Sequence, residues 1–271
     1  MTSPDFRDFA PTPGMQGIKD FRPAGDPWPA DKPMPWIWKG LIPAGDCLTT
    51  MIGPVDVGRM ALTLHLAKAL REKQASLGGA ALTAGHSLVV LNFDRTEAQL
   101  DNLSVRVGAS TPVAGRPGFF TPCFVSLGHG RAASSELITD DEQSWRWLWS
   151  NLRDTRRLYP DHLIVACNTR HCFPAHYWSR EGVIQLMDQC RRHGGPWLFC
   201  DHTRFTKSKR HLVQPCGSSL LTTLADRVVT LERWSGGIEA RGVGAGHPTV
   251  TAQVETPWLK NPMDFLGYEL Q

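Results

Sequence analysis

Several features that would mark a membrane or secreted protein are absent from the 271 residues of this chain. No run of about 18 or more apolar residues occurs, which excludes a predicted transmembrane helix. The opening residues, MTSPDFRDFAP, lack the basic start and the apolar centre of a signal peptide. The seven cysteines are odd in number and lack the spacing of a disulfide framework. We therefore expect reduced thiols in a cytoplasmic protein that makes no membrane contact.

A strong excess of charge is also lacking. The 29 lysines and arginines nearly balance the 26 acidic residues, which leaves a formal net charge of +3. Such a mild charge is no evidence for a nucleic-acid partner by itself, so that case depends on where the cations lie. The hydrophobic content of 41% is ordinary for a globular protein. The length suffices for one α/β domain with a large core or for two small domains.

Prolines recur throughout residues 1–35 and exclude a regular helix there. We predict that these residues form a proline-rich N-terminal arm, followed by one domain over residues 36–271 with a β-rich C-terminal extension. The arm suits two roles equally, because either could use its aromatic side chains as anchors. It could lie over its own domain, or it could dock on a neighbouring subunit or another protein. These aromatic residues are Phe6, Phe9, Phe21 and Trp28.

The stretch 36–70 organises the domain. A β-prone run at 47–52 leads into a loop that contains Gly53 and Gly58, and a helical pattern of apolar residues follows. A strand, a glycine loop and a helix form the frame in which backbone N–H groups surround a phosphate.

The phosphate-loop motif G-x-x-x-x-G-K-[ST] is incomplete in this frame, because Arg59 and Met60 replace its last two residues. Met60 offers a thioether, which cannot bind Mg²⁺ as a hydroxyl does. Arg59 keeps a positive charge and a bidentate fork, so it is either a static contact for an anion or a plain surface arginine. We expect no firmly bound cofactor and leave weak ATP or ADP binding open.

Strand-like and helix-like segments alternate along the rest of the chain. Continuous apolar strands separated by helices are typical of a parallel sheet covered on both faces. The predicted class is α/β, with a mostly parallel sheet flanked by helices. The predicted strands are 87–93, 124–127, 162–167, a strand starting in 195–200, 226–232 and part of 242–254, and the predicted helices are 97–107, 140–159, 181–193 and 218–225.

Over about residues 36–233 the chain resembles the RecA-like P-loop ATPases, in particular the RepA-type hexameric replicative helicases. The resemblance is carried by WIWKGLIPAG before the glycine loop, then LVVLNFDRTEAQL, CDHT and GSSLLTTLADRVVTLER. No single motif is decisive, but their order and spacing imply a RecA-like P-loop fold. The resemblance also implies a homo-oligomeric ring or filament with the nucleotide between neighbouring subunits.

The resemblance further implies a nucleotide site that has lost its catalytic groups. Asp94 matches the acidic residue that polarises the attacking water, with Glu97 close behind it. Cys167, or Ala166 if the register shifts by one, replaces the metal-associated aspartate. Because phosphoryl transfer depends on positioning and electrostatics around Mg²⁺, these changes together favour a pseudo-ATPase. The degenerate nucleotide-binding set is Gly53, Gly58, Arg59, Met60, Cys167, Asp201 and His202, and Asp94 is the one candidate catalytic residue.

In the RecA-like fold the loops after the fourth and fifth strands contact DNA. The first loop here mixes cations with aromatic rings, which suits stacking on bases beside phosphate contacts. The second has four cations within residues 204–210, although such a charge run is also typical of a solvated loop. The candidate nucleic-acid-binding residues are Arg170, His171, Phe173, Tyr177 and Trp178 in the first loop and Arg204, Lys207, Lys209 and Arg210 in the second.

Two other chemistries have weaker support. Zinc would accept His162, Cys167, Cys172 and His176, but their spacing is not that of a paired knuckle, so we predict no metal site. The run Cys200-Asp201-His202 contains the residue types of a cysteine hydrolase without a fitting nucleophile turn. The resemblance instead assigns Asp201 and His202 to a strand end that senses the nucleotide.

Three hypotheses about function remain. The first is a catalytically degenerate, oligomeric DNA-binding protein, with single-stranded DNA preferred, in replication, recombination or mobile-element biology. The second is an active but atypical ATPase or helicase motor that uses Arg59 and Asp94. The third is a protein-interaction scaffold without nucleic-acid binding.

Overall fold

The computed structural model describes residues 29, 32–55, 57–86, 88–92, 103–109, 123–126, 149, 153, 162–167, 179–205, 211–215, 219–244 and 247–256. Most of the proline-rich arm lies outside this part of the chain. Within the described residues, no helix is long and apolar enough to cross a membrane.

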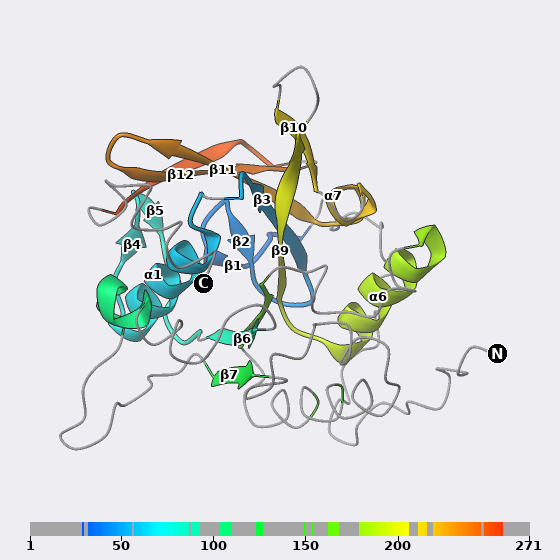
Figure 1. Ribbon diagram of the computed structural model, residues 1–271. Coiled ribbons are helices and arrows are strands. Elements are labelled where there is room, and N and C mark those ends of the chain that lie inside the picture. Colours follow the sequence, from blue (N-terminus) through cyan, green and yellow to red (C-terminus); the bar gives the residue numbers. More distant parts are fainter. Residues whose placement is uncertain are drawn as a thin grey trace.

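In the part of the chain that the structure describes, nine strands form the main sheet. Figure 1 shows their arrangement. Their order is β13-β12-β11-β3-β9-β8-β6-β7, and β10 pairs with β9 off this path. All neighbours from β11 to β7 run parallel, whereas β10, β12 and β13 pair antiparallel. The structure therefore confirms an α/β protein with a mostly parallel sheet. The strands are β3 (Leu48–Gly53), β6 (Leu88–Asn92), β7 (Cys123–Ser126), β8 (Leu163–Ala166), β9 (Trp197–Phe205), β10 (His211–Pro215), β11 (Arg227–Trp234), β12 (Gly237–Val243) and β13 (Val250–Glu255).

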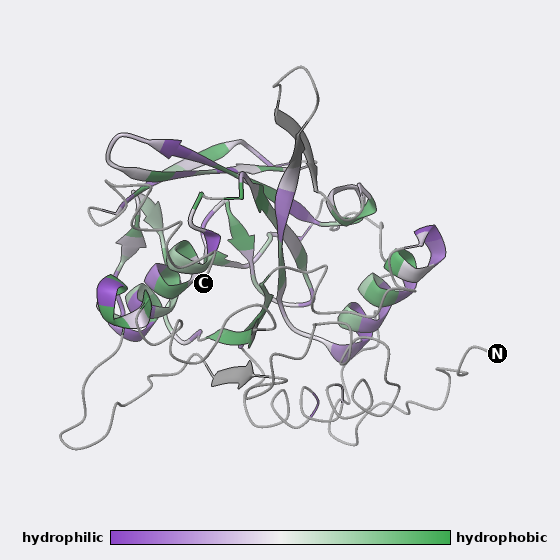
Figure 2. Cartoon of the chain, in the orientation of Figure 1, coloured by the Kyte–Doolittle hydropathy of each residue, from purple (hydrophilic) through white to green (hydrophobic). Residues whose placement is uncertain are grey.

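Helices cover both faces of this sheet and form two hydrophobic cores. The core on one face includes α1 (Arg59–Arg71), and the core on the other includes α6 (Arg180–His193) and part of α7 (Leu220–Thr223). Strand β6 contributes to both, because Val90 points to the α1 side while Val89 and Leu91 point to the α6 side. Figure 2 shows β6 in apolar colours and α6 with both polar and apolar residues, as expected for a helix with one solvated face.

A buried ion pair fixes the amino end of β3. Arg191 of α6 lies 3.0 Å from Asp226, which directly precedes β11, and both side chains are almost fully buried. The same carboxylate accepts a hydrogen bond from the Leu48 N–H at 2.8 Å, and the Asp226 N–H donates to the Leu48 carbonyl. This aspartate therefore joins α6, β3 and β11 at the end of the sheet opposite to the glycine loop.

A second buried cation, Arg227, clamps the antiparallel end of the sheet. Its guanidinium donates to the carbonyls of Gly40, Gly242 and Pro248, and it lies 5.6 Å from the centre of the Trp36 ring. Burial lowers the pKa of Arg227 from its ordinary value. These bonds tie β11 and β12 to the turn that precedes β2.

The sequence prediction missed several short or irregular strands. Two small hairpins, β1–β2 and β4–β5, lie in regions interpreted as a lead-in and as a connector, because two or three residues show no usable alternation. Strand β12, GIEARGV, was missed because glycines weaken its β-propensity. A two-residue Ser-Gly turn at 235–236 joins it to β11. The bounds of the small hairpins are β1 (Trp36–Trp38), β2 (Ile42–Pro43), β4 (Ser76–Leu77) and β5 (Ala80–Ala81).

The predicted second DNA loop requires a correction. Residues 203–205 belong to β9 and residue 211 begins β10, so the region expected to be a long loop is an antiparallel hairpin with a five-residue connection. Phe205 pairs with His211, and Thr203 pairs with Pro215. Backbone pairing dominates over the polar and charged composition that favoured a loop.

Candidate functional site: the glycine loop and the β9–β10 hairpin

The strand, glycine loop and helix expected from the sequence are present. Strand β3 ends at Gly53, and Gly58 precedes α1 with φ 91° and ψ 36°, a left-handed conformation that favours glycine. A side chain at Gly53 would meet Val57 at 2.8 Å and Leu231 at 2.9 Å. Gly58 is therefore required by the backbone conformation, and Gly53 by the lack of room for a side chain.

The Arg59 side chain turns back into the loop instead of pointing to solvent. Its Nη1 donates to the carbonyls of Gly53 at 3.0 Å, Pro54 at 3.3 Å and Asp201 at 3.1 Å. Gly53 ends β3, and Asp201 belongs to the neighbouring strand β9, so one guanidinium nitrogen bridges two parallel strands. The two hydrogens on this nitrogen are shared among three protein oxygens, which leaves it little capacity for an external anion.

The second terminal nitrogen of Arg59 contacts His202. Nη2 lies 2.5 Å from Nδ1 and 3.0 Å from Nε2 of the imidazole. Arginine is protonated in proteins and can only donate, so a ring nitrogen of His202 must accept. This contact therefore requires the neutral form of His202, because a protonated ring would place two cations against each other.

The sulfur atoms of Met60 and Cys167 meet beside the loop. They lie 3.9 Å apart, and the residues are only 5% and 4% exposed. The resemblance assigns Met60 to the position of a Mg²⁺-binding hydroxyl and Cys167, which follows β8, to that of an aspartate. The structure thus brings these two altered positions into contact, as a buried pair of soft atoms that suits neither Mg²⁺ nor its waters.

Asp201 is a buried carboxylate next to this site. Its residue is 1% exposed, and Oδ1 accepts a hydrogen bond from the His202 backbone N–H at 2.7 Å. Asp201 pairs with Ile52 of β3 and His202 pairs with Gly53, so both residues lie at the carboxyl end of the parallel sheet. The strand end assigned to nucleotide sensing is thus in direct contact with the glycine loop, through Arg59.

The β9–β10 hairpin continues beyond this point. Strand β9 pairs with β3 up to His202, and its next residues pair with β10. Arg204 lies in this hairpin strand. The other predicted nucleic-acid-binding residues lie outside the described part of the chain, as does the candidate catalytic residue Asp94. These residues are Arg170, His171, Phe173, Tyr177, Trp178, Lys207, Lys209 and Arg210.

Within the described residues, no group of three or more histidine, cysteine, aspartate or glutamate side chains could hold a metal ion. Of the four residues of the zinc alternative, His162 and Cys167 are described, whereas Cys172 and His176 lie outside the described residues. A groove of about 480 Å³ lies away from the glycine loop, on the outer face of β11 and β12. Its lining mixes both charge signs with small side chains and includes Glu232, Glu239 and Arg241.

The role of Arg59 as a bridge between two parts of the chain was not predicted from the sequence. The available signal was the pair Asp201-His202 at the end of a strand predicted to lie in the same sheet as the glycine loop. An imidazole at that place offers the acceptor that an arginine needs. The spacing of the two segments, about 140 residues apart, does not by itself reveal the contact.

The chain matches no known protein-family model, and a search of curated proteins finds no match.

Proposed function

We propose that this protein is a catalytically degenerate RecA-like pseudo-ATPase that binds DNA, preferentially single-stranded. The strands that carry the resembling segments are neighbours in one parallel sheet, in the order β3-β9-β8-β6, which supports the RecA-like assignment. The proposed cellular role is that of an accessory factor in replication, recombination or mobile-element biology, with a homo-oligomeric ring or filament as the working form.

The contact of Met60 with Cys167 is the observation that favours loss of hydrolysis. It replaces two Mg²⁺-binding positions by a buried pair of sulfur atoms. Metal-assisted phosphoryl transfer depends on the ion for charge neutralisation worth several kcal/mol. The engagement of Arg59 with protein carbonyls also supports weak binding, or none, of ATP and ADP. The proposal therefore includes no cofactor.

The hairpin is the observation that carries the proposed DNA binding. It extends from the carboxyl end of the parallel sheet, the edge at which open α/β proteins bind ligands. Its connection contains Lys207, Lys209 and Arg210. Cations at this place would bind phosphates and release counterions. Aromatic residues of the segment 170–178 are proposed to stack on the bases.

The test measures fluorescence anisotropy of a labelled single strand at several salt concentrations, with and without Mg²⁺ and ATP. We compare the parent with a variant in which Lys207, Lys209 and Arg210 are glutamine. The slope of log affinity against log salt should flatten by about 0.7 per lost phosphate contact on a single strand. The control variant removes three other cations, at the exposed positions Lys39, Lys73 and Arg180.

The outcomes separate the three hypotheses. A control variant that binds like the parent, beside a hairpin variant with weaker binding and a flatter slope, supports the proposal. ATP hydrolysis by the parent, measured separately as phosphate release, would favour the motor hypothesis instead. A parent that binds no DNA at low salt would favour the scaffold hypothesis and lead to a search for protein partners.

A further inference from the structure

We propose that Arg59 is a positioning residue that holds the base of the β9–β10 hairpin in place of a bound nucleotide. The inference rests on the proposed function for its DNA consequence and on contacts within the chain for its structural part. It predicts that the DNA-binding form is permanently assembled, so that binding needs no nucleotide.

The first argument is the position of the contacted residues. His202 is the last residue of β9 that pairs with β3, and Thr203 is the first that pairs with β10. The Arg59 guanidinium contacts the ring of His202 and the carbonyl of Asp201 at this junction. It therefore holds the strand where support from the central sheet ends and the hairpin begins.

The second argument is the rigidity of the other side of the link. Arg59 is the first residue of α1, and Nη1 is anchored on the carbonyls of Gly53 and Pro54. Gly53 is packed so tightly against Val57 and Leu231 that it has no room for a side chain. A fixed anchor transmits its position to the hairpin, whereas a mobile one would not.

The third argument is the chemistry of the guanidinium. A lysine ammonium is a single point of charge, whereas arginine has donors that point in separate directions. Nη1 donates hydrogen bonds to the backbone oxygens, and Nη2 donates to the ring of His202. An arginine in this loop can thus join two strand ends that a lysine would reach less completely. Arg59 supplies a permanent connection from inside the chain.

The experiment follows amide hydrogen exchange of the full chain by mass spectrometry. Replacing Arg59 by alanine removes several hydrogen bonds that its charged guanidinium donates. Exchange of the backbone amides in 202–205 and 211–215 should therefore accelerate by about tenfold or more. Exchange in β8 and α6 should keep the parent rate, which a general loss of stability would not allow. Parent rates throughout 202–205 and 211–215 in the Arg59→Ala variant would overturn the inference.

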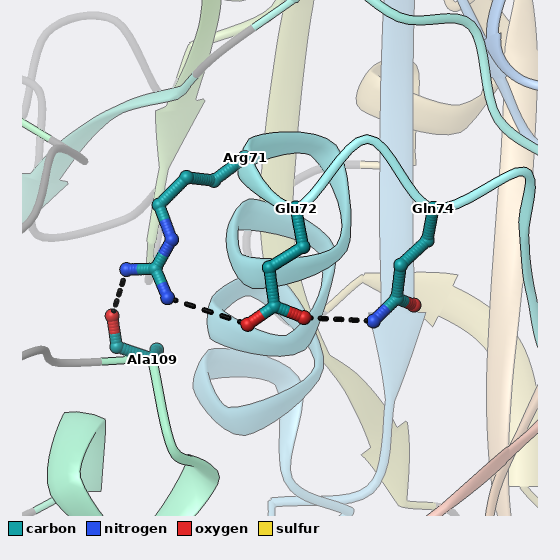
Figure 3. Close-up of polar contacts among 4 residues, drawn as sticks. All are labelled: Arg71, Glu72, Gln74 and Ala109. Carbon is teal, nitrogen blue, oxygen red and sulfur yellow. Dashed lines mark hydrogen bonds and ion pairs between the residues drawn. The ribbon is translucent and has the colours of Figure 1, made fainter.

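Arg71 supplies a matched control on the same helix (Figure 3). It lies at the other end of α1, about 18 Å along an axis that rises about 1.5 Å per residue. Arg71 also donates to a backbone carbonyl, that of Ala109 at 2.7 Å, and it contacts Glu72 at 3.4 Å. Arg71→Ala removes the same charge and a comparable hydrogen bond, and it should leave the hairpin amides unchanged. Equal acceleration in both variants would contradict a specific role for Arg59.

Two further variants keep the inference testable if Arg59→Ala does not fold. His202→Ala leaves Arg59 its carbonyl partners and should give a smaller acceleration confined to the same amides. Arg59→Lys keeps the charge without the fork and should give intermediate rates. Full protection in the lysine variant would show that charge alone holds the hairpin, which contradicts the argument from geometry.

DNA binding supplies the functional measurement. The parent should bind a labelled single strand with the same affinity with and without Mg²⁺ and ATP. Arg59→Ala should weaken binding, and Arg71→Ala should not. A parent that fails to bind DNA refutes the proposed function, while the exchange data still decide whether Arg59 positions the hairpin. A parent whose affinity requires ATP refutes the inference alone.

Discussion

Introducing the Mg²⁺-binding groups that the resemblance expects tests the proposed degenerate nucleotide site most directly. Replacing Cys167 by aspartate places a carboxylate where a buried thiol now lies 3.9 Å from the thioether of Met60. The position is only 4% exposed. An uncompensated buried charge costs about 3–5 kcal/mol, so the variant should unfold at a clearly lower denaturant concentration than the parent.

When Met60→Ser and Arg59→Lys are added to Cys167→Asp, the stability of the triple variant should depend on Mg²⁺ and ATP. The serine and the aspartate would then offer oxygen atoms to Mg²⁺, and the lysine would be available to a phosphate. Binding to the folded state at 100 times the dissociation constant stabilises it by about 2.7 kcal/mol. Urea unfolding with and without Mg²⁺ and ATP measures this recovery, although the three contacting positions are not expected to add simply.

Cys190→Asp is the matched control. Cys190 is also fully buried, but it lies on α6 in the core of the opposite sheet face. The Cys190→Asp variant should be destabilised to a similar extent, and Mg²⁺ and ATP should not restore its stability. The reasoning fails if the unmodified protein is stabilised by ATP only when Mg²⁺ is present and hydrolyses it in a manner abolished by Arg59→Ala.

Three further predictions concern stability. Asp226→Ala leaves the buried Arg191 charge and the Leu48 N–H without this carboxylate, so urea unfolding should show a loss of about 3–5 kcal/mol, and a loss below about 1 kcal/mol would contradict the described pairing. Arg227→Met removes the clamp on three carbonyls and should cost about 2–4 kcal/mol, with hydrogen exchange accelerated in β12 and β13 rather than in β8. Burial, aided by Lys68, lowers the pKa of His65 from 6.5 to about 4. As the pH falls, the unfolded chain therefore takes up a proton on His65 at a higher pH than the folded chain does. The contribution of His65 to the unfolding free energy should be fully present above pH 6.5 and should be lost as the pH falls toward 4. The shift sets an upper limit of roughly 3 kcal/mol, and partial exposure reduces this to roughly 1–2. His65→Leu should flatten the unfolding free energy over this pH range, and an unchanged slope would refute the assignment.

The central strands were predictable because each is a short apolar run between segments of other periodicity. β6 and β8 are continuous in apolar residues, since both of their faces are buried. The glycine loop was predictable for a different reason, because the spacing marks two glycines, one required by a left-handed backbone and the other by tight packing. Features that depend on one element at a time are therefore visible in the sequence.

The long-range contacts were not predictable in the same way. Arg227 gives no sign in the sequence that it will bind Gly40, 187 residues away, and Asp226 gives none that it will meet Arg191 of α6. The hairpin was misread because a run of cations and hydroxyls favours a loop when no pairing partner is known. Strand pairing is set by the sheet as a whole, so local composition could not predict it.

Under the proposed function, Arg59 also explains how the glycine loop can keep its shape without a bound phosphate. A phosphate normally balances the N–H groups that converge at such a helix start, and a lysine needs that phosphate as a partner. Arg59 instead finds its acceptors within the chain, on Gly53, Pro54, Asp201 and His202. Because its partners come from both β3 and β9, these contacts hold the loop from within the chain. Under the proposed pseudo-ATPase function, a substitution that removes turnover would at the same time maintain the architecture, so a retained frame would be no evidence for turnover.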